Sequence, residues 1–376
     1  MKLSFSSQMK CILIFIVIAG LAGTSSATLI SFQELGFLPG GSYTEAYGVS
    51  PDGSVVVGTS GSPPGGLQAF RWEGGVMTGL GVLSAGDISE ASGASNNGVV
   101  IVGSSMSSPQ QGEAFRWEGV MSGLGTLGGV NSSASGVSNN GLVVVGSSAS
   151  PSYPMEAFRW EMGVMTGLGV LPGAIGSEAI DVSANGLVVA GSSGPSPADM
   201  QAFRWEGDVM TPLGFLPGDS RSLASAISAD GLVVVGGSDY GNPYVEAFRW
   251  EAGVMTSLGY LPGMDGSAAL NVSGDGSVVV GECFNALGGP EASEAFIWDA
   301  FFGMRSVEDV LTGLGLDLTG WSLESCTAIS DDGLTLAGNG LDPTGAPGAW
   351  VATIPEPTTM CLLGLGGVLL LRKRRV

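Results

Sequence analysis

One short block of sequence recurs seven times along this 376-residue chain and restricts what the chain can fold into. The block reads Ala-Phe-Arg-Trp in five copies, Ala-Phe-Ile-Trp in the sixth and only Ala-Trp in the seventh. Successive tryptophans lie 43 to 52 residues apart, which is the length of a four-stranded propeller blade. A β-helix coil is shorter, and helical repeats of this length do not contain so much glycine and valine. The copies end at Trp72, Trp117, Trp160, Trp205, Trp250, Trp298 and Trp350.

Each repeat is predicted to form four β-strands. The first strand ends at a Ser-x-Asp-Gly or Ser-x-Asn-Gly turn, which favours a hairpin because the last two residues tolerate positive φ. The second strand is a nearly continuous apolar run, typical of a strand buried on both faces. The third carries the tryptophan block, and the fourth follows a short glycine turn. No window has a sustained helical period, so we expect an all-β fold. The seven turns occupy residues 50–53, 95–98, 138–141, 183–186, 228–231, 273–276 and 330–333.

The number of strands of each kind predicts how the repeats close. First, second and third strands each number seven, whereas fourth strands follow only the first six repeats. The missing segment stands at the other end of the chain, because residues 35–40 repeat the sequence Leu-Gly-Phe-Leu-Pro-Gly of residues 213–218. An N-terminal strand that completes the last blade also protects the exposed edges of an open stack. We therefore predict a closed seven-bladed β-propeller over residues 28–353, with an open β-solenoid as the alternative.

The first 27 residues have the pattern of a secretory signal peptide. Lys2 and Lys10 supply the positive region, and residues 11–22 form an apolar run that is short for a membrane span. Small residues before Thr28 predict cleavage between Ala27 and Thr28. The alternative is an uncleaved N-terminal anchor.

The last 23 residues, 354–376, form a second segment outside the predicted propeller. Pro355, Glu356 and Pro357 precede an apolar stretch at residues 360–371, which is too short to span a bilayer comfortably, and a basic cluster at residues 372–375. This order of features closely resembles the PEP-CTERM sorting signal of bacteria with a Gram-negative type of envelope. The resemblance implies recognition, and expected cleavage, by an exosortase-type enzyme. It also implies that the chain contacts the membrane only through this tail, before processing.

The repeat body resembles the HAF-repeat family of extracellular bacterial proteins. The resemblance rests on the Ala-Phe-Arg-Trp blocks, on Met-Thr-Gly-Leu-Gly segments and on Leu-Pro-Gly turns such as the one beginning at Leu171. It implies an exported repeat protein and supplies no catalytic residues. The sixth repeat departs from the pattern with Ile297 in place of arginine and a longer segment at residues 304–323. The seventh keeps only its tryptophan.

Composition excludes several classes of function. The chain has no histidine, which removes Ser-His-Asp and Cys-His nucleophile pairs and histidine-containing zinc sites. Six of its 13 basic residues lie in the two terminal segments, so seven arginines face 34 acids, Glu356 of the tail included, a net charge of −27. Such a body lacks the basic footprint that nucleic acids require and repels anionic polymers. We expect no cofactor, no metal and no nucleic-acid partner.

The residues repeated in every regular unit favour a structural role. Each regular arginine precedes a glutamate by two residues on the same strand face, as Arg71 precedes Glu73. We interpret these as ion pairs that stay in the blade or reach the neighbouring blade, because a binding site normally breaks the symmetry of a repeat. A ring of guanidinium groups that binds an acidic ligand is the alternative. Phe and Trp of the block, and Met of the fourth strand, are interpreted as core.

The two cysteines of the body are candidates for a disulfide. Export to an oxidising compartment favours a bridge, and Cys283 and Cys326 are predicted to lie in adjacent repeats. Two free buried thiols are the alternative. Metal binding by two cysteines without histidine is not expected, and the Asp-Gly and Asn-Gly turns lack the ligand series of a calcium hand. A few incidental calcium sites at these turns are the alternative.

Irregular loops are the best candidates for ligand contacts, since function concentrates where a rigid scaffold carries variable loops. Aromatic side chains on one rim of a ring can stack against sugars or peptides, although packing within the loops is the favoured explanation for them. The candidate contacts are Tyr153, Tyr240, Tyr244, Phe284 and Trp321.

These features together predict an exported, non-enzymatic protein with a binding or structural role at the cell surface, in the cell envelope or in an extracellular matrix. Its expected partners are the sorting enzyme and, beyond that, exopolysaccharide or surface proteins. The alternative is a propeller hydrolase or lyase that acts on polysaccharide with paired carboxylates. Glu308 and Asp309 are the candidates, but neighbours on a strand point to opposite faces, which disfavours them as a pair.

Overall fold

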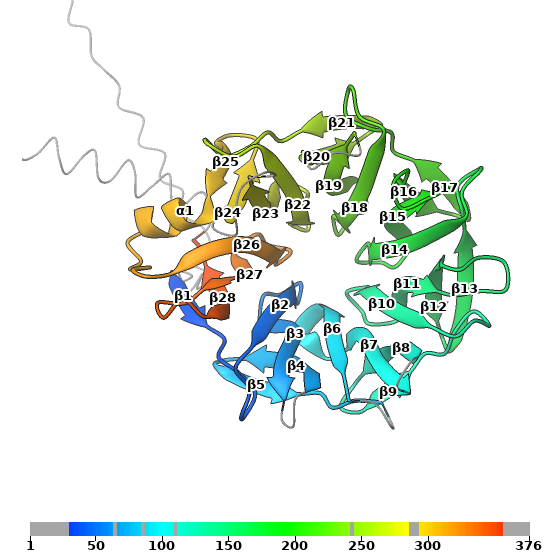
Figure 1. The fold of residues 1–376 in the computed structure, drawn as a ribbon, viewed down its shortest axis with the longest axis horizontal. Helices are drawn as coiled ribbons and strands as arrows, with labels where there is room; N and C mark the ends of the chain where they lie inside the picture. The colour runs from blue at the N-terminus through cyan, green and yellow to red at the C-terminus, as the bar shows by residue number, and fades with distance from the viewer. Residues whose placement is uncertain are drawn as a thin grey trace, which may run out of the picture.

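Seven four-stranded antiparallel sheets stand around a central axis, as Figure 1 shows. This computed structural model describes residues 30–62, 66–83, 87–108, 111–240, 244–285 and 293–355. The predicted all-β, seven-bladed propeller is confirmed. The proposed cleavage site at Ala27 and Thr28 lies outside the described residues, as do Glu356 and Pro357.

The blades are numbered here in chain order, and each is given from its innermost to its outermost strand. Blade 1 consists of β2 (Thr44–Val49), β3 (Val55–Ser62), β4 (Gly66–Glu73) and β5 (Val76–Gly79). Blade 2 consists of β6 (Ser89–Ala94), β7 (Ile101–Ser108), β8 (Gln111–Trp117) and β9 (Met121–Gly123). Blade 3 consists of β10 (Ser132–Val137), β11 (Val143–Ser148), β12 (Glu156–Glu161) and β13 (Val164–Gly169). Blade 4 consists of β14 (Gly176–Val182), β15 (Val188–Gly194), β16 (Gln201–Glu206) and β17 (Val209–Pro212).

The remaining three blades complete the ring. Blade 5 consists of β18 (Arg221–Ile227), β19 (Val233–Asp239), β20 (Glu246–Glu251) and β21 (Val254–Ser257). Blade 6 consists of β22 (Gly266–Val272), β23 (Val278–Phe284), β24 (Ser293–Asp299) and β25 (Gly303–Ser306). Blade 7 consists of β26 (Ser322–Ile329), β27 (Thr335–Leu341), β28 (Pro347–Thr353) and β1 (Ser31–Glu34).

Strand β1 closes the ring as the outermost strand of blade 7. It pairs antiparallel with β28, with Ser31 opposite Thr353 and Glu34 opposite Trp350. One further backbone bond, from the Leu35 N–H to the Ala349 carbonyl at 2.9 Å, extends this pairing. The first and last strands of the propeller are therefore hydrogen-bonded, which excludes the open solenoid.

The turns between first and second strands are built by their own side chains. In blade 1, the Ser50 hydroxyl donates to Asp52 Oδ1 at 2.7 Å and accepts from the Val55 N–H at 3.0 Å. Gly53 follows with φ of 73°, a conformation that favours glycine. The same bond from serine to Asp or Asn forms in blades 3 to 7. These side chains therefore act in turn formation, as their positions predicted.

The hydrophobic core lies between neighbouring blades. The phenylalanine of each of the first six blocks is fully buried, and burial of such a side chain contributes about 1.5–3 kcal/mol. In blades 2 to 6 the tryptophan of the block and the methionine of the fourth strand are only partly buried and cover the edge of a cluster. Trp350 of blade 7 is fully buried instead. The interpretation of these residues as core is confirmed. The phenylalanines are Phe70, Phe115, Phe158, Phe203, Phe248 and Phe296.

The long sixth repeat contains a helix that the sequence pattern did not predict. Helix α1 (Val307–Gly313) follows β25, and the Ser306 hydroxyl accepts from the Asp309 N–H at 3.4 Å at its start. Val307 and Leu311, four residues apart, are fully buried. Two buried positions are too few to show a helical period, which explains why the pattern missed it. A second short helix, the 3-10 turn η1 (Asn96–Gly98), replaces the regular turn of blade 2.

Candidate functional site

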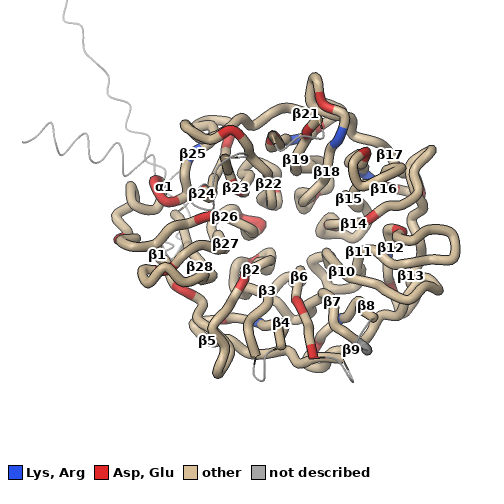
Figure 2. Tube along the Cα trace, viewed as in Figure 1, with Lys and Arg blue, Asp and Glu red and all other residues tan. Residues whose placement is uncertain are grey.

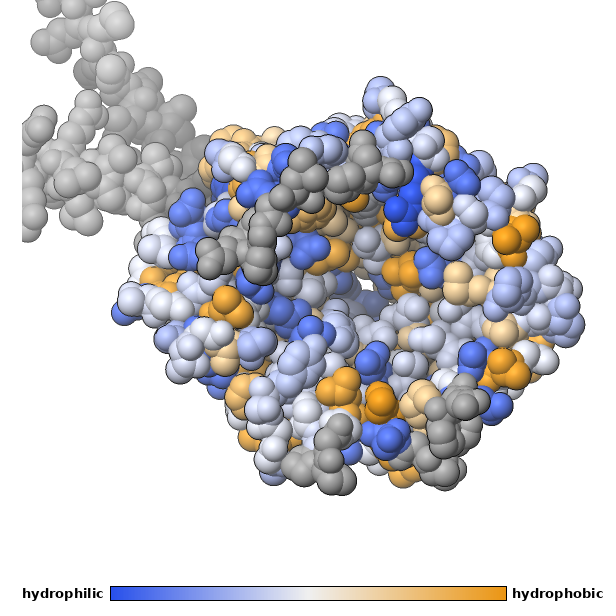
Figure 3. All heavy atoms as spheres, in the orientation of Figure 1, coloured by the Kyte–Doolittle hydropathy of each residue, from blue (hydrophilic) through white to orange (hydrophobic). Residues whose placement is uncertain are grey.

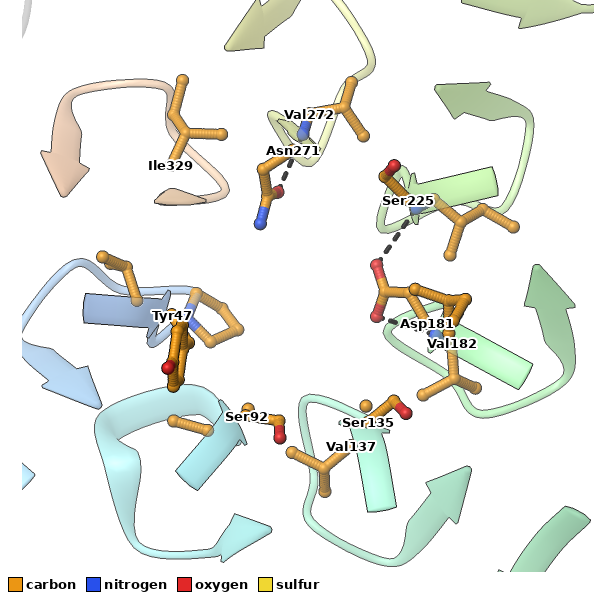
Figure 4. Close-up of a pocket in the computed structure, with 18 of the residues that line it drawn as sticks. Tyr47, Ser92, Ser135, Val137, Asp181, Val182, Ser225, Asn271, Val272 and Ile329 are labelled. Atoms are coloured by element: carbon orange, nitrogen blue, oxygen red, sulfur yellow. Dashed lines mark hydrogen bonds between the residues drawn. The ribbon is translucent and has the colours of Figure 1, made fainter. Parts of the chain in front are cut away.

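A cavity of about 330 Å³ lies on the axis of the ring and is lined by the inner strands of all seven blades (Figure 4). Each inner strand has a β-bulge at the same position, and the bulged residue lines the cavity. A tier of mostly branched apolar residues lies between the bulges and the turns. The bulged residues are Tyr47, Ser92, Ser135, Ile180, Ser225, Leu270 and Thr327. The apolar tier consists of Val49, Ala94, Val137, Val182, Ile227, Val272 and Ile329.

The position directly after the bulge breaks the symmetry of the ring. Five blades place glycine or alanine there, whereas blade 4 has Asp181 and blade 6 has Asn271. In Figure 4 the Asp181 carboxylate faces the backbone of the next blade, and the Asn271 amide points into the cavity. Sequence reasoning missed both residues. The signal was present, however, because they stand two residues before the serine of each turn, where the other repeats have only small residues.

Asp181 connects two blades from within the channel. Its Oδ1 accepts from the Val182 N–H at 2.8 Å, and its Oδ2 accepts from the Ile227 N–H of blade 5 at 3.0 Å. Burial raises the pKa of this carboxyl to about 6, because these two hydrogen bonds only partly offset the loss of water. The negative charge of Asp331 adds to the rise. Asp181 therefore titrates near neutral pH, unlike an exposed aspartate.

Backbone hydrogen bonds between turns form an almost complete belt at one end of the channel. The second residue of each turn donates its N–H to the carbonyl of its counterpart in the next blade, at 2.9 to 3.2 Å. The belt breaks once, because Pro51 has no N–H to donate to Asn96. There the backbone of Asn97, with φ of 61°, donates instead to the Asp52 carboxylate. The belt joins Asn96, Asn139, Ala184, Ala229, Gly274, Asp331 and Pro51 in this order.

One side-chain bond crosses the axis at this end. Asn139 Nδ2 of blade 3 donates to Asp331 Oδ2 of blade 7 at 2.9 Å, although two blades separate them on the shorter path around the ring. Burial raises the pKa of Asp331, and the bond from Asn139 opposes the rise. The belt and this cross-link narrow the channel at the turn end. The opposite face carries the loops between second and third strands, and Figure 3 shows it hollowed at its centre.

Acidic and phenolic groups lie near the loop end of the inner strands. The Tyr47 hydroxyl donates to Glu45 Oε2 at 2.5 Å. Burial raises the pKa of Tyr43 to about 12, and its hydrogen bond to Glu45 adds to the rise. Glu178 of blade 4 also has a raised pKa because of burial. No basic residue lines the axial cavity, so a ligand there meets carboxylates, hydroxyls and amides.

Every arginine in the described residues is already ion-paired. In blades 1 to 5 the repeated arginine binds the glutamate two residues later at 2.7 to 2.8 Å. Its Nε donates to the carbonyl of the turn glycine in the next blade at 2.9 to 3.4 Å. Arg221 pairs with Asp239, and Arg305 pairs with Asp299. The structural interpretation of the repeat is confirmed. Figure 2 shows that acidic positions outnumber basic ones around the ring.

The aromatic candidates are dispersed over four blades, and none of them lines the axial cavity. Tyr240 and Tyr244 share the β19–β20 loop of blade 5, and both are exposed. Tyr153 lies in the β11–β12 loop of blade 3 and is partly buried. Phe284 ends β23 opposite Gly266 in blade 6. Trp321 packs edge-on against Phe32 at 5.2 Å in blade 7, so its ring serves packing there.

The two body cysteines are free thiols in this structure, and the suggested bridge between them is not formed. Cys283 packs in the core between blades 5 and 6, with its sulfur 3.4 Å from that of Met304. Cys326 packs in the core between blades 6 and 7. The sheet of blade 6 lies between these cores, because Cys283 shares its strand face with Val279 and not with Val280. Burial raises the pKa of both thiols, that of Cys283 to about 11.

The carboxylates considered for catalysis lie at the junction of blades 6 and 7. Glu308 and Asp309 stand in the first turn of α1, so the expectation that they lie on a strand is wrong. Burial, with added charge from Glu294 and Asp309, raises the pKa of Glu308. Glu282 and Glu324, on facing strands of the two blades, also have raised pKa values because of burial. Within the described ranges, no group of three acidic or cysteine side chains is arranged to hold a metal ion.

Comparison with known proteins identifies the tail and the fold. Residues 353–375 match the PEP-CTERM protein-sorting motif. Among solved structures, the β-propeller domain of the Trilobed protease from Pyrococcus furiosus is similar at TM-score 0.53 and 8% identity, over 82% of this chain and 95% of that domain. A prolyl endopeptidase is similar at TM-score 0.52 and 11% identity, over 84% of this chain and 50% of its own. TolB from Acinetobacter baumannii aligns at TM-score 0.43 and 12% identity, over 65% and 60% of the two chains.

The two similarities with TM-scores above 0.5 establish the propeller fold alone and carry no activity to this chain, because their identities are only 8% and 11%. The chain spans about half of the prolyl endopeptidase and 60% of the Acinetobacter TolB. Comparison with curated proteins finds no match. No helix among the described residues is long and apolar enough to cross a membrane.

Proposed function

We propose that this chain is an exported propeller that an exosortase-type system sorts to the cell surface or releases into the matrix, where it binds or scaffolds. The observation that carries the proposal is the PEP-CTERM motif at residues 353–375, which directly follows the last strand of a closed ring. We also assign the repeats to the HAF type and residues 1–27 to a cleaved signal peptide, from their sequence patterns.

The distribution of symmetry in the ring supports a binding role. The polar side chains that recur in the regular blades already have partners within the ring. The repeated arginines form ion pairs, and the turn serines form hydrogen bonds. Departures from symmetry occur in the channel, at Asp181 and Asn271, and the loops between second and third strands vary in sequence from blade to blade. A rigid ring with a variable face is the usual arrangement of a binding protein. The proposed partners are the sorting enzyme, then exopolysaccharide or surface proteins.

A polysaccharide hydrolase or lyase is the second candidate, and one observation favours it. Glu282 and Glu324 lie on facing blades, and the charge of Glu324 adds to the raised pKa of Glu282. Glycosidases use a pair of carboxylates of which one is kept protonated.

Two experiments test the proposal. Deletion of residues 355–376 should change where the protein is retained, as measured by fractionation of cells and medium. Unchanged surface retention and processing would contradict sorting. The purified exported chain should be retarded in gels that contain a polysaccharide it binds, without release of new reducing ends. New reducing ends that disappear in Glu282→Gln would establish the enzyme instead.

A further inference from the structure

A second cavity, of about 500 Å³, opens between blades 2 and 3 near the loop face. Its walls come from β7 and β8 of blade 2 and from β10, β11 and the segment before β12 of blade 3, which lie side by side in Figure 1. None of the aromatic candidates considered above lines it.

A single residue leaves this space open. Gly112 stands two residues before the alanine of the tryptophan block, where other blades have larger side chains. A Cβ placed on Gly112 would meet no atom within 4 Å, and its φ lies outside the left-handed region. The position therefore accepts a side chain without backbone strain. Its counterparts in the other blades that have the block are Leu67, Met155, Met200, Val245 and Ser293.

A second departure from the repeat removes charge from the same junction. Ser133 of β10 takes the position at which β2, β6 and β14 have Glu45, Glu90 and Glu178. No acidic or basic residue lines the cavity, although residues 28–353 have 33 acids against seven arginines. The loss of bulk at Gly112 and the loss of charge at Ser133 thus coincide in one place.

The polar groups in the cavity are available to a ligand. The hydroxyls of Ser104, Ser133 and Ser147 are partly exposed and make no hydrogen bond within the described part of the chain. Asn131 Oδ1 accepts from the Gly112 N–H at 3.2 Å, a bond that does not use the amide's Nδ2 donor. Met106 and Met155 add apolar surface. By contrast, Ser132 and Ser148 also line the cavity but hold neighbouring loops with their hydroxyls.

We propose that this cavity binds a sugar unit of an uncharged polysaccharide. Hydroxyls and an amide exchange hydrogen bonds with sugar hydroxyls, and methionine side chains cover the apolar face of the ring. The volume lies within the range of small-ligand pockets. The surrounding negative potential opposes an anionic polymer, and the cavity itself offers no carboxylate to a cation. This inference rests on the proposed binding role and gives that role a location and a ligand class.

Affinity gel electrophoresis of the purified exported chain tests the inference. The gels contain dextran, mannan or galactan as neutral polymers, and alginate or polygalacturonate as anionic ones. We expect a neutral polymer to retard the protein and the anionic polymers not to. Gly112→Met, which introduces the residue that blades 3 and 4 have, should weaken retardation about tenfold or more by filling the cavity. Val245→Met, which introduces the same residue at the equivalent position of blade 5, is the control and should behave as the wild type.

The outcomes separate the two proposals. Retardation by no neutral polymer, or equal retardation of wild type and Gly112→Met, overturns the cavity inference. If a polymer binds equally well to Gly112→Met, the proposed binding role survives and its site lies elsewhere on the ring. Ser133→Glu, which restores the charge found in three other blades, should abolish neutral binding without changing the folded far-UV spectrum. Unaltered binding by Ser133→Glu also contradicts the inference.

Discussion

The five junctions between blades 1 and 6 are held together differently from the two that blade 7 makes. At each regular junction an arginine donates to the turn glycine of the next blade, as Arg204 donates to Gly231. Blade 6 has Ile297 at this position, and its junction with blade 7 contains twelve buried apolar residues, including Leu311 of α1 and Trp350. The same polar contact thus recurs at the five regular junctions, whereas the junction of blades 6 and 7 is held by a larger apolar core.

The junction between blades 7 and 1 uses a third arrangement. Asn339 accepts from the Ala46 N–H at 2.8 Å and donates to the Ala46 carbonyl at 3.1 Å. The Thr327 hydroxyl donates to the same carbonyl at 2.9 Å. Side chains found only in blade 7 therefore form the hydrogen bonds of the Ala46 backbone in the inner strand of blade 1. The comparison indicates that stability should be most sensitive to substitution in blade 7 and least sensitive at the repeated arginines.

The largest expected effect is at Trp350. Its ring is fully buried, stacks near Phe32 at 6.1 Å and donates from Nε1 to the Asn339 carbonyl at 3.1 Å. Trp350→Ala should lower the free energy of unfolding by about 3–5 kcal/mol, measured by urea denaturation. Trp205→Ala, in a regular blade where the ring is only partly buried, is the control and should cost clearly less. Equal losses would remove the distinction between the two kinds of junction.

The next effect concerns pH and Asp181. Its pKa of about 6 in the folded chain exceeds the ordinary value of 3.8, so the folded state binds a proton more readily than the unfolded state. The stability that this proton gives is present below about pH 4 and is lost as the pH rises through 6. Asp181→Asn removes the dependence, so the stability of the variant relative to wild type should rise by about 2 kcal/mol between pH 4 and 7.5.

Comparing wild type with Asp181→Asn separates the effect of the Asp181 carboxyl from that of other groups whose pKa is also raised. Glu178, Glu282 and Asp331 also have raised pKa values and remain in both proteins. Urea unfolding curves at half-unit pH intervals measure the difference. If the difference in unfolding free energy between Asp181→Asn and wild type does not change with pH, the charged form of Asp181 carries no cost in the folded ring.

A smaller effect is expected at a regular arginine. Arg204→Met removes the ion pair with Glu206 and leaves the Gly231 carbonyl without its side-chain donor, at a cost of about 1–2 kcal/mol. Glu206→Gln breaks only the exposed ion pair and should cost less than about 1 kcal/mol. Thermal unfolding of both variants measures the two contributions. A larger loss in Glu206→Gln would mean that the ion pair, and not the contact between blades, stabilises the junction.

The smallest expected effect concerns the reactivity of the two cysteine thiols. Both thiols are buried with raised pKa values, so neither should react with iodoacetamide in the folded protein at pH 8. Both should react once the chain is unfolded in urea without reductant, which mass spectrometry detects. A molecule lighter by two hydrogens that does not react would instead establish the Cys283–Cys326 bridge.

Much of the fold followed from the sequence because its signals are local. Apolar strands, Asn-Gly and Asp-Gly turns and the tryptophan blocks identify the blades one at a time. The copy of Leu-Gly-Phe-Leu-Pro-Gly at residues 35–40 predicted closure by an N-terminal strand, and the pairing of Ser31 with Thr353 confirms it. Helix α1 was not predicted because only two of its residues, Val307 and Leu311, are buried, which is too few to show a helical period.

The candidate sites followed less well, because they depend on which surfaces meet. Asp181 and Gly112 are visible in an alignment of the repeats, but only the structure shows that one faces the channel and the other a cavity. The aromatic side chains chosen from the loops do not converge, since Trp321 packs on Phe32, and Tyr153 lies in blade 3 whereas Tyr240 and Tyr244 lie in blade 5.

By itself the sequence determined the number of blades, the strand that closes the ring and the sorting signal, because each is a short pattern read along the chain. Tertiary structure alone decided that the repeated arginines bind the turn glycine of the next blade and that Asn139 binds Asp331 across the axis. It also placed Cys283 and Cys326 in different cores. These contacts join residues 25 to 192 positions apart, and their geometry is fixed only when the sheets pack around the axis.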